Sequence, residues 1–532
     1  MSLRHITALP CAAAMLCLCA PAARAQSAFV QVLRGDTIAI ERFTRTPTRL
    51  DVSMSGKGGA RQVTSSRIES DGRLGAMTLT AYASSAADAA PAAEAQIDMA
   101  GDTAIASMRS GGVAAPVQRI PSRRLAQPLL SNSFAQFEAV VTAARRERTA
   151  TVTVPGFFVT GGATIDIAMS GLLGDSVTMQ VATVTIWMVT DTAGRIVRAG
   201  VPSQSLVVTR VTGPAASKLE QGKPDYAPPA GAPYTAETVT VPTTLGHTLG
   251  GTFTKPAGRT DRLPAVISIT GSGPQDRDEQ ITIVPGGYRL FRQIADTLGK
   301  RGIAMLRMDD RGVGASGGSF ATADSRDFAN DIRAGVSYLR TRADVDPARI
   351  FLAGHSEGGS IAPMVAVEEP ALAGIVLMAG PGRTGREIVR FQRRYAIEHD
   401  TTLSPSRRRE LLAGMDSSVN VTMKSTRWLT FFATYDPLAT ARQVKVPVLL
   451  LQGGDDQQVI AAEMPLLEKA FRDGGNRDVT ARVFPGLNHL FILQPGGDPA
   501  GYTTLTTNLA SPQVLGALAD WITAHAASVP GR

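Results

Sequence analysis

One short segment restricts the fold of this chain more than any other. The apolar run 349–353 leads directly into Gly354-His355-Ser356-Glu357-Gly358, and a helical pattern follows over 357–368. This is G-x-S-x-G between a strand and a helix, a setting in which the glycines permit a sharp turn and the serine hydroxyl stands exposed at the helix N-terminus. The pattern predicts that Ser356 is a nucleophile; its alternative is an ordinary Gly-rich turn.

The sequence around this segment alternates between apolar strands and helices. Nearly continuous apolar strands separated by helices indicate a mainly parallel sheet that is covered on both faces, so the expected fold class is α/β. The predicted strands are 236–241, 249–254, 264–270, 303–308, 349–353, 373–379, 446–452 and 479–484, and the predicted helices are 288–300, 326–341, 357–368, 460–472 and 513–526.

The part of the chain before residue 212 follows another pattern. Short runs such as 181–187 alternate in polarity between Gly-rich turns, which is typical of an antiparallel sheet. One helix is predicted over 134–145, so we expect a β-rich domain over 26–211 that curves around this helix. The Pro- and Gly-rich stretch 212–234 is predicted to be a linker, and 235–532 the α/β domain.

A serine hydroxyl becomes a useful nucleophile only when a base takes its proton. The sequence has six histidines. His489 follows the last predicted strand, 479–484, whereas the others lie in the leader, in a turn, inside the elbow, in a polar helix and near the C-terminus. We predict that His489 is the base; its alternative is a hydrogen-bonded loop histidine.

Two adjacent aspartates compete for the role of the carboxylate that orients the imidazole. Asp455 and Asp456 both follow the apolar strand 446–452, and Asp456 has G-x-x-D-x-x-V spacing between Gly453 and Val459. This spacing favours Asp456 as the acid of a triad. Asp455 stays the alternative, and either residue could instead cap the following helix.

The strand 264–270 ends in a Gly-rich loop that could supply donors to an oxyanion. We expect the backbone N–H of Ser272 or Gly273 to act together with that of Glu357. Pro274 has no N–H and is excluded, and the sequence does not choose between Ser272 and Gly273.

Residues 1–25 have the pattern of a secretory signal peptide. A positive start at Arg4 is followed by an apolar stretch that is too short to span a membrane, and Ala23 and Ala25 stand at −3 and −1 of the predicted cleavage site. We therefore expect export to the periplasm or the medium. All three cysteines lie in this leader, so the mature chain would have no disulfide, thiol nucleophile or Cys metal site.

Charge and hydropathy exclude two further classes of function. The formal net charge is +8, but Lys and Arg do not gather in one stretch with interleaved aromatics, so nucleic-acid binding is not indicated. No apolar run of about 18 residues follows the leader, so no membrane span is predicted. We expect no metal or cofactor. The curved-sheet pattern of 26–211 suggests weak association with the cell envelope.

Four stretches of the α/β region carry a family resemblance. They are GSGPQDRD (271–278), MDDRGVGASGG (308–318), GHSEGG (354–359) and TYDPLATARQVKVPVLLLQGGDDQQV (434–459). With them, 235–532 resembles the bacterial exported α/β-hydrolases, namely the serine carboxylesterases and the related acyltransferase/thioesterase group. The resemblance implies the α/β-hydrolase fold and the triad order Ser356, Asp456, His489. It also implies that Asp309 or Asp310, Arg311 and Ser316 brace loops.

In this fold an insert such as 383–442 forms a cap over the nucleophile. Its aromatic side chains Trp428, Phe431 and Phe432 are candidates to line an acyl pocket, which would favour hydrophobic acyl groups. The alternative, given equal weight, is that they only pack the cap onto the core.

These features together predict an exported serine hydrolase that cleaves small-molecule carboxylic esters through an acyl-enzyme. One alternative is a serine peptidase of the prolyl-oligopeptidase type, which usually carries a propeller, although no repeat is visible here. Another is an acyltransferase or thioesterase, whose CoA substrates are cytoplasmic. A binding protein on a degenerate hydrolase fold is the non-enzymatic alternative, but binding alone would not need all three triad residues.

Overall fold

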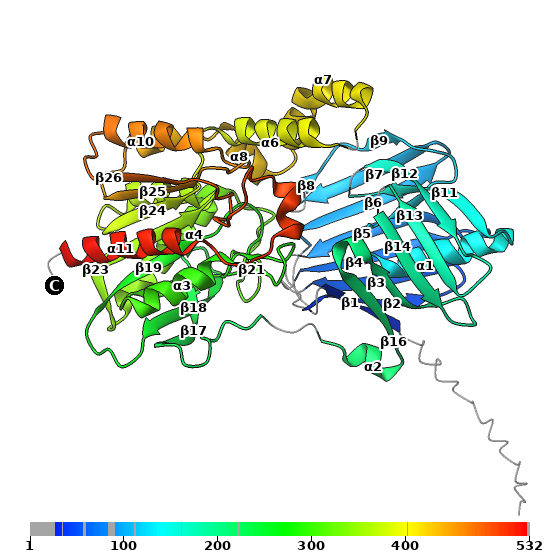
Figure 1. Ribbon diagram of the computed structural model, residues 1–532, viewed down its shortest axis with the longest axis horizontal. Coiled ribbons are helices and arrows are strands. Elements are labelled where there is room, and N and C mark those ends of the chain that lie inside the picture. The colour runs from blue at the N-terminus through cyan, green and yellow to red at the C-terminus, as the bar shows by residue number, and fades with distance from the viewer. Residues whose placement is uncertain are drawn as a thin grey trace, which may run out of the picture.

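The computed structural model describes residues 27–33, 36–56, 60–82, 91–110, 113–160, 162–182, 184–220, 224–401 and 403–528. The predicted signal peptide and all three cysteines lie outside the described residues. Two bodies lie side by side, a β-rich domain formed by the first part of the chain and an α/β domain formed by the rest (Figure 1).

The α/β domain is built on an eight-stranded sheet in the order β17-β18-β22-β19-β23-β24-β25-β26. Only β18 runs antiparallel to its neighbours, and all other adjacent pairs are parallel. The exchange of the third and fourth strands and the single antiparallel second strand are the topology of the α/β-hydrolase fold, so the predicted fold class is confirmed. The strands are β17 (Tyr234–Pro242), β18 (Thr248–Pro256), β19 (Leu263–Ile269), β22 (Ala304–Met308), β23 (Val345–His355), β24 (Gly374–Met378), β25 (Val448–Gly453) and β26 (Val479–Phe484).

Helices cover both faces of this sheet because its strands are apolar on both sides. One face carries α4 (Ser325–Thr341), α5 (Gly358–Glu368) and α10 (Met464–Asp473). The other carries α3 (Leu290–Lys300) and α11 (Pro512–Ser528). Each set closes one buried apolar core, which leaves the loops at the strand ends as the place for polar chemistry.

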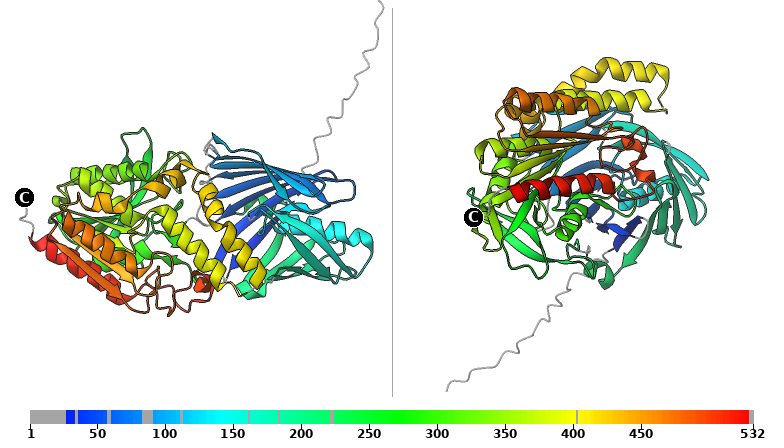
Figure 2. Two further views of the ribbon diagram at one scale, coloured as in Figure 1. Left: turned by 90° about the horizontal axis from the view of Figure 1, so that it is seen from above. Right: turned by 60° about the vertical axis from the view of Figure 1, so that its left-hand side comes forward.

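Four helices lie between β24 and β25, in the insert predicted to be a cap. They are α6 (Gly385–His399), α7 (Pro405–Thr422), α8 (Arg427–Thr434) and α9 (Pro437–Ala441). A small core of their own, which includes Met415, Val419 and Ala433, holds α7 and α8 together. Seen from above, α6 and α7 lie near the junction of the two domains (Figure 2).

The β-rich domain is one curved sheet of 16 strands around a buried helix. The sheet runs antiparallel from β11 to β16 and on from β1 to β8, while β10 pairs parallel with β11 and β9 pairs with β7. Its strands are β1 (Ser27–Leu33), β2 (Asp36–Arg45), β3 (Arg49–Gly56), β4 (Arg61–Ile68), β5 (Leu74–Tyr82), β6 (Ala93–Ala100), β7 (Thr103–Ser110), β8 (Val113–Ala114), β9 (Gln118–Pro121), β10 (Gln127–Leu129), β11 (Thr151–Phe158), β12 (Ala163–Ser170), β13 (Ser176–Val181), β14 (Val184–Thr190), β15 (Ile196–Val201) and β16 (Leu206–Thr212).

The buried helix is α1 (Phe134–Ala144), whose aromatic and aliphatic side chains fill the curve of the sheet. Backbone N–H groups at its N-terminus are hydrogen-bonded inside the protein. The Ser133 hydroxyl accepts from Gln136 N, and the Glu41 carboxylate accepts from Phe134 N at 2.9 Å. This arrangement agrees with the β-rich domain and the single helix expected from the sequence.

The predicted linker is more ordered than its composition suggests. It contains the short helix α2 (Pro214–Lys218), whose Ala216 is fully buried against the β-rich domain. Further along, Tyr226 donates to the Asp276 carboxylate at 3.0 Å and therefore ties the linker to the α/β domain.

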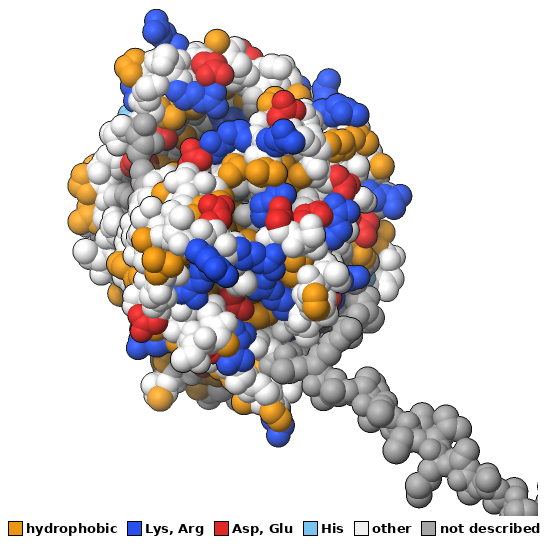
Figure 3. Space-filling view, turned by 90° about the vertical axis from the view of Figure 1, so that its right-hand side faces the viewer, with side chains coloured by type: hydrophobic (Ala, Val, Ile, Leu, Met, Phe, Trp, Pro, Cys, Tyr) orange, Lys and Arg blue, Asp and Glu red, His pale blue; other side chains and the backbone are white. Residues whose placement is uncertain are grey.

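The far end of the β-rich domain carries mixed charge. Lys and Arg side chains gather near the middle of this face, with Asp and Glu between them (Figure 3). In the described part of the chain, no helix combines the length and apolarity needed to cross a membrane.

Candidate active site

Ser356 stands at the sharp turn between β23 and α5 in a left-handed conformation, with φ of 53°. Such a φ is strained for a residue with a side chain and is typical of a nucleophile elbow. The turn depends on two glycines. A Cβ on Gly354 would lie 2.1 Å from the oxygen of Gly358, and a Cβ on Gly358 would lie 2.2 Å from the oxygen of Ile269.

His489 and Asp456 are in direct contact, although 33 residues separate them. Nδ1 of His489 lies 2.7 Å from Oδ2 of Asp456, and both side chains are buried. The other oxygen of Asp456 accepts from the backbone N–H groups of Gln458 and Val459 at 2.7 and 2.9 Å. These donors hold the carboxylate in place, so it can fix the orientation of the imidazole.

The neighbouring Asp455 has a structural role. Its two oxygens accept from Gly486 N at 3.0 Å and from Gly496 N at 2.7 Å. It therefore braces the loop that carries His489, and it caps no helix. Of the two aspartates left open by the sequence, Asp456 is the one that contacts the histidine.

Ser356 and His489 line the same cavity, which we call the central cavity. Its volume is about 470 Å³, within the range of small-molecule sites. The loops after β19, β23 and β25 contribute to its walls, and α6 and α8 of the cap complete them. The predicted nucleophile and base are thus brought to one place by loops at the ends of different strands.

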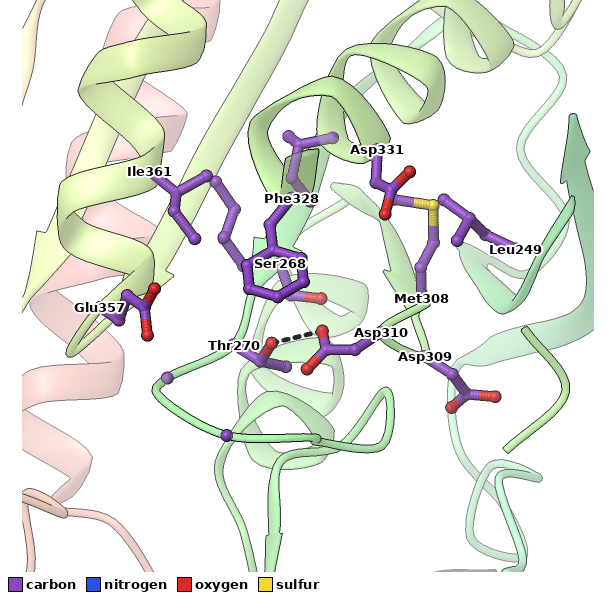
Figure 4. Close-up of a pocket in the computed structure, with 14 residues that line it drawn as sticks. Leu249, Ser268, Thr270, Met308, Asp309, Asp310, Phe328, Asp331, Glu357 and Ile361 are labelled. Atoms are coloured by element: carbon purple, nitrogen blue, oxygen red, sulfur yellow. Dashed lines mark hydrogen bonds between the residues drawn. The ribbon is translucent and has the colours of Figure 1, made fainter. Parts of the chain in front are cut away.

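Hydrogen bonds to Asp310 hold the 270–279 loop, which contains the predicted oxyanion donors, in place. Asp310 accepts from Thr270 Oγ1 at 2.7 Å and from Gln275 N at 2.9 Å. Ser272 lines the central cavity, while Gly273, with φ of 92°, lines a smaller cavity behind the loop. Figure 4 shows this inner cavity, with the bond from Thr270 to Asp310 on one side and Glu357 on the other. Its volume of about 30 Å³ suits one or two water molecules and excludes a substrate.

Buried ion pairs brace the same loop and its neighbour after β22. Arg277 donates to Asp309 with Nη2 at 2.6 Å from Oδ2, and Arg307 donates to Asp278. Arg311 pairs with Asp331 on α4 at 2.6 Å. The contacts of Asp309 and Arg311 agree with the bracing role that the resemblance implied for these two residues.

The side chain of Glu357 links three parts of the site. Its carboxylate accepts from Ser325 Oγ at 2.6 Å on α4 and from Trp428 Nε1 at 2.8 Å on α8. The Ser272 side chain lies close enough to lower the pKa of this carboxylate. Burial raises the pKa of Glu357 above its ordinary value, and these hydrogen bonds oppose that rise. The cap and the 270–279 loop therefore meet at the residue that follows Ser356.

His355, inside the elbow, forms a second link that the sequence did not reveal. Its Nδ1 lies 2.8 Å from the Glu279 carboxylate, and its Nε2 lies 3.0 Å from the backbone oxygen of His489. The same Glu279 oxygen accepts from Gly271 N at 3.1 Å. Burial lowers the pKa of His355, but the Glu279 carboxylate, the backbone oxygen of His489 and the charge of Asp456 together raise it by more, so the pKa lies above its ordinary value.

The aromatic residues of α8 divide between two environments. Trp428 and Phe432 line the central cavity and stack with ring centroids 5.8 Å apart. Phe431 does not line this cavity: it stacks on Tyr435 and faces the Arg326 guanidinium. The grouping of all three in one pocket is therefore corrected. Residues 428 and 432 share a helix face at a spacing of four, and 431 is rotated about 100° from 432.

Within the described residues, no group of three His, Cys, Asp or Glu side chains is arranged to hold a metal ion. The polar groups that surround Ser356 instead contact one another or backbone amides.

Comparisons with known proteins found a matching family model and several relatives. A family described as "Serine aminopeptidase, S33" (Hydrolase_4) matches residues 278–495. Esterase EstD of Thermotoga maritima is 28% identical over 316 residues, which is 58% of this chain and 71% of the relative. The uncharacterized protein YfhR of Salmonella typhi is 31% identical over 130 residues, 24% of this chain and 39% of the relative.

Solved structures are similar to about half of this chain at low sequence identity. Est1E from Butyrivibrio proteoclasticus is 16% identical with a TM-score of 0.37, covering 55% of this chain and 99% of that chain. The esterase Pf2001 of Pyrococcus furiosus is 19% identical with a TM-score of 0.37, covering 50% of this chain and 86% of that chain. By its strand order and its elbow, this chain is an α/β-hydrolase in fold, preceded by a β-rich domain.

Proposed function

We propose that this protein hydrolyses carboxylic esters through an acyl-enzyme on Ser356, with His489 as base and Asp456 as the carboxylate that orients it. The observation that carries the proposal is the 2.7 Å contact between His489 Nδ1 and Asp456 Oδ2 beside a strained serine in one cavity. As a reaction class, the chain is a carboxylic-ester hydrolase, in line with its similarity to Esterase EstD. The residue roles and the acyl-enzyme route are the further step proposed here.

In the proposed reaction these residues act in the following order. Nδ1–H of His489 donates to Asp456, so Nε2 is left as the acceptor for the Ser356 proton. The serine oxygen attacks the ester carbonyl carbon, and the carbonyl oxygen becomes an oxyanion. His489 then gives its proton to the alcohol oxygen as the bond from carbon to that oxygen breaks. Water repeats the sequence on the acyl-enzyme, releases the acid and restores the serine.

We assign the oxyanion donors to the backbone N–H of Glu357 and an N–H of the 270–279 loop, at Ser272 or Gly273. The N–H of Glu357 lies at the start of α5, where the helix dipole favours negative charge. Ser272 lines the central cavity beside Ser356. Each donor of this kind is expected to contribute about 3 kcal/mol to transition-state stabilisation.

A panel of p-nitrophenyl esters of graded acyl length, run beside aminoacyl and peptidyl anilides, tests the reaction class and the nucleophile together. Ester turnover by the wild type that disappears in Ser356→Ala supports the proposal. Preferential cleavage of the anilides would favour the peptidase alternative, a reaction that the name of the matching family also suggests. Ester turnover that persists in Ser356→Ala would contradict the assigned nucleophile.

We also propose that the protein is exported, with cleavage after Ala25, and that its β-rich domain associates weakly with the cell envelope. The composition of residues 1–25 supports export, and the mixed charge at the far end of the β-rich domain is compatible with a weak association. N-terminal sequencing of the protein from fractionated cells tests the first point. Comparison of the envelope-bound fraction with and without 27–225 tests the second.

A further inference from the structure

A second hollow opens beside the central cavity, and we call it the side cavity. It has a volume of about 660 Å³ and shares Gln392, Gln458 and Pro499 with the central cavity. The C-terminal half of α6 forms one wall, and the loops after β25 and β26 form the others. A molecule bound at Ser356 could therefore extend into it.

The side cavity lies on the base side of the catalytic residues. Gln457 and Gln458 directly follow Asp456, and Asp498 to Ala500 belong to the segment that follows His489. Trp428 lies in another part of the central cavity wall, where it donates to Glu357, the residue that follows Ser356. The proton of His489 must reach the leaving alcohol, so the alcohol lies on the His489 side and the acyl chain lies toward Trp428.

Polar and apolar groups both line the side cavity, and its charged side chains include two carboxylates. Asp400 and Asp498 contribute carboxylates, Gln457 and Gln458 contribute amides, and none of the described residues that line it is Lys or Arg. Amides and carboxylates together offer both donors and acceptors, which suits a group with several hydroxyls. The two carboxylates would repel the phosphates of a CoA leaving group.

One wall also presents an aromatic surface. Tyr395 and His399 are stacked, with ring centroids 3.9 Å apart and planes at 17°. The Nδ1–H of His399 donates to the backbone oxygen of Tyr395 at 2.9 Å, which holds the two rings one helical turn apart in register. A flat aromatic surface beside amides and carboxylates matches a ring that has apolar C–H faces and polar edges.

We propose that the side cavity is the leaving-group subsite of this esterase and that it accepts a neutral, polyhydroxylated alcohol of the sugar type. This inference rests on the proposed function and adds the class of alcohol to it. The acyl group passes to the Ser356 oxygen, and the sugar oxygen leaves with the proton held by His489. Water then completes the hydrolysis, so no further reactant is needed.

Four esters of the same acid test the subsite: 6-O-hexanoylglucose, ethyl hexanoate, hexanoylcholine and hexanoyl-CoA. We expect kcat/KM to be at least tenfold higher for the glucose ester than for the ethyl ester. Tyr395→Ala and Asp498→Asn should each lower the ratio of these two values about fivefold or more. Arg394→Ala is the matched control, since Arg394 is exposed on the same helix and pairs with Glu398; it should leave the ratio unchanged.

Several outcomes would overturn the subsite. They are equal kcat/KM for the glucose and ethyl esters, a preference for the choline or CoA ester, and a ratio that the two variants do not change. Binding of 6-O-hexanoylglucose to Ser356→Ala, measured by calorimetry, separates this proposal from the proposed function. Binding that Tyr395→Ala weakens supports the subsite even if turnover proves to use another nucleophile, and absence of binding rejects the subsite.

Discussion

Nδ1 of His355 lies 2.8 Å from the carboxylate of Glu279, and this pair joins the two loops that flank Ser356. Glu279 also holds Gly271 N, and His355 also holds the backbone oxygen of His489. Both ring nitrogens of His355 therefore face acceptors, namely the Glu279 carboxylate and a backbone oxygen. A neutral imidazole has only one N–H, so satisfying both contacts takes one proton more than a neutral imidazole beside an ionised carboxylate holds. The charge of Asp456 also raises the pKa of His355.

Glu279→Gln should therefore lower kcat about tenfold or more while KM changes little, because the loops that carry the base and the oxyanion donors lose their common anchor.

The pH dependence of kcat should also differ between the two proteins. The pKa of His355 is raised, so the link that protonated His355 makes between the loops is present at low pH and is lost as the pH rises through that pKa. The wild type should lose activity on the alkaline side, and the variant should lack this limb. Parallel pH profiles of kcat for the two proteins check this. Glu410→Gln, at an exposed ion pair on α7, is the control; identical profiles for all three proteins would reject the link.

The two adjacent aspartates allow a matched test of the triad. Asp456→Asn should lower kcat by about 10³-fold to 10⁴-fold, because the amide favours the wrong tautomer of His489. Asp455→Asn should lower kcat by less than tenfold, since the Asp455 carboxylate braces a loop through the backbone N–H groups of Gly486 and Gly496. Steady-state kinetics on one p-nitrophenyl ester compares them. Equal losses in the two variants would show that the assignment between the aspartates is wrong.

The strained turn at Ser356 predicts a difference in stability between two inactive variants. Ser356→Ala keeps a side chain at φ of 53°, whereas Ser356→Gly removes it. We expect the glycine variant to be more stable than the alanine variant by about 1 kcal/mol. Thermal or urea unfolding of both checks the difference. An alanine variant equal to or more stable than the glycine variant would mean that the turn stores no such strain.

The two environments on α8 predict which aromatic residue affects substrate choice. Trp428→Ala should widen the cavity and shift the preferred acyl length, and it also removes the donor to Glu357. Phe431→Ala, outside the cavity on the same helix, should leave the acyl-length preference unchanged. The measurement is kcat/KM across p-nitrophenyl esters from acetate to decanoate. No change in Trp428→Ala would reject its role in the pocket.

Asp276 predicts a pH dependence of stability. Burial first, and then Asp278, raises the pKa of Asp276 to about 6 from its ordinary 3.8. Folding therefore takes up a proton between about pH 4 and 6, so the free energy of unfolding falls as the pH rises through this window and levels off above it. The full effect is at most about 3 kcal/mol. Asp276→Asn should flatten this slope in urea titrations between pH 4 and 8, and an unchanged slope would contradict the shift.

Local patterns were enough to predict much of the catalytic domain. The alternation of apolar strands and helices predicted its fold class, because each element depends mainly on the periodicity of its own residues. The elbow, the loop histidine at 489 and the spacing around Asp456 predicted where the site lies, because side chains that follow parallel strands meet at one edge of the sheet. The curved sheet around 134–144 followed from the same kind of pattern.

Tertiary structure decided which side chains meet across that edge. It separated Asp456 from Asp455 and Phe431 from its neighbours on α8, and it brought Glu279 to His355 across 76 residues. It also turned the side chain of Glu357 toward Trp428 of the cap. Such contacts join loops that are far apart in the chain, so they depend on strand order and helix packing and leave no periodic trace in the sequence. The sequence determined the elements and their chemistry, and the packing of those elements determined the partners.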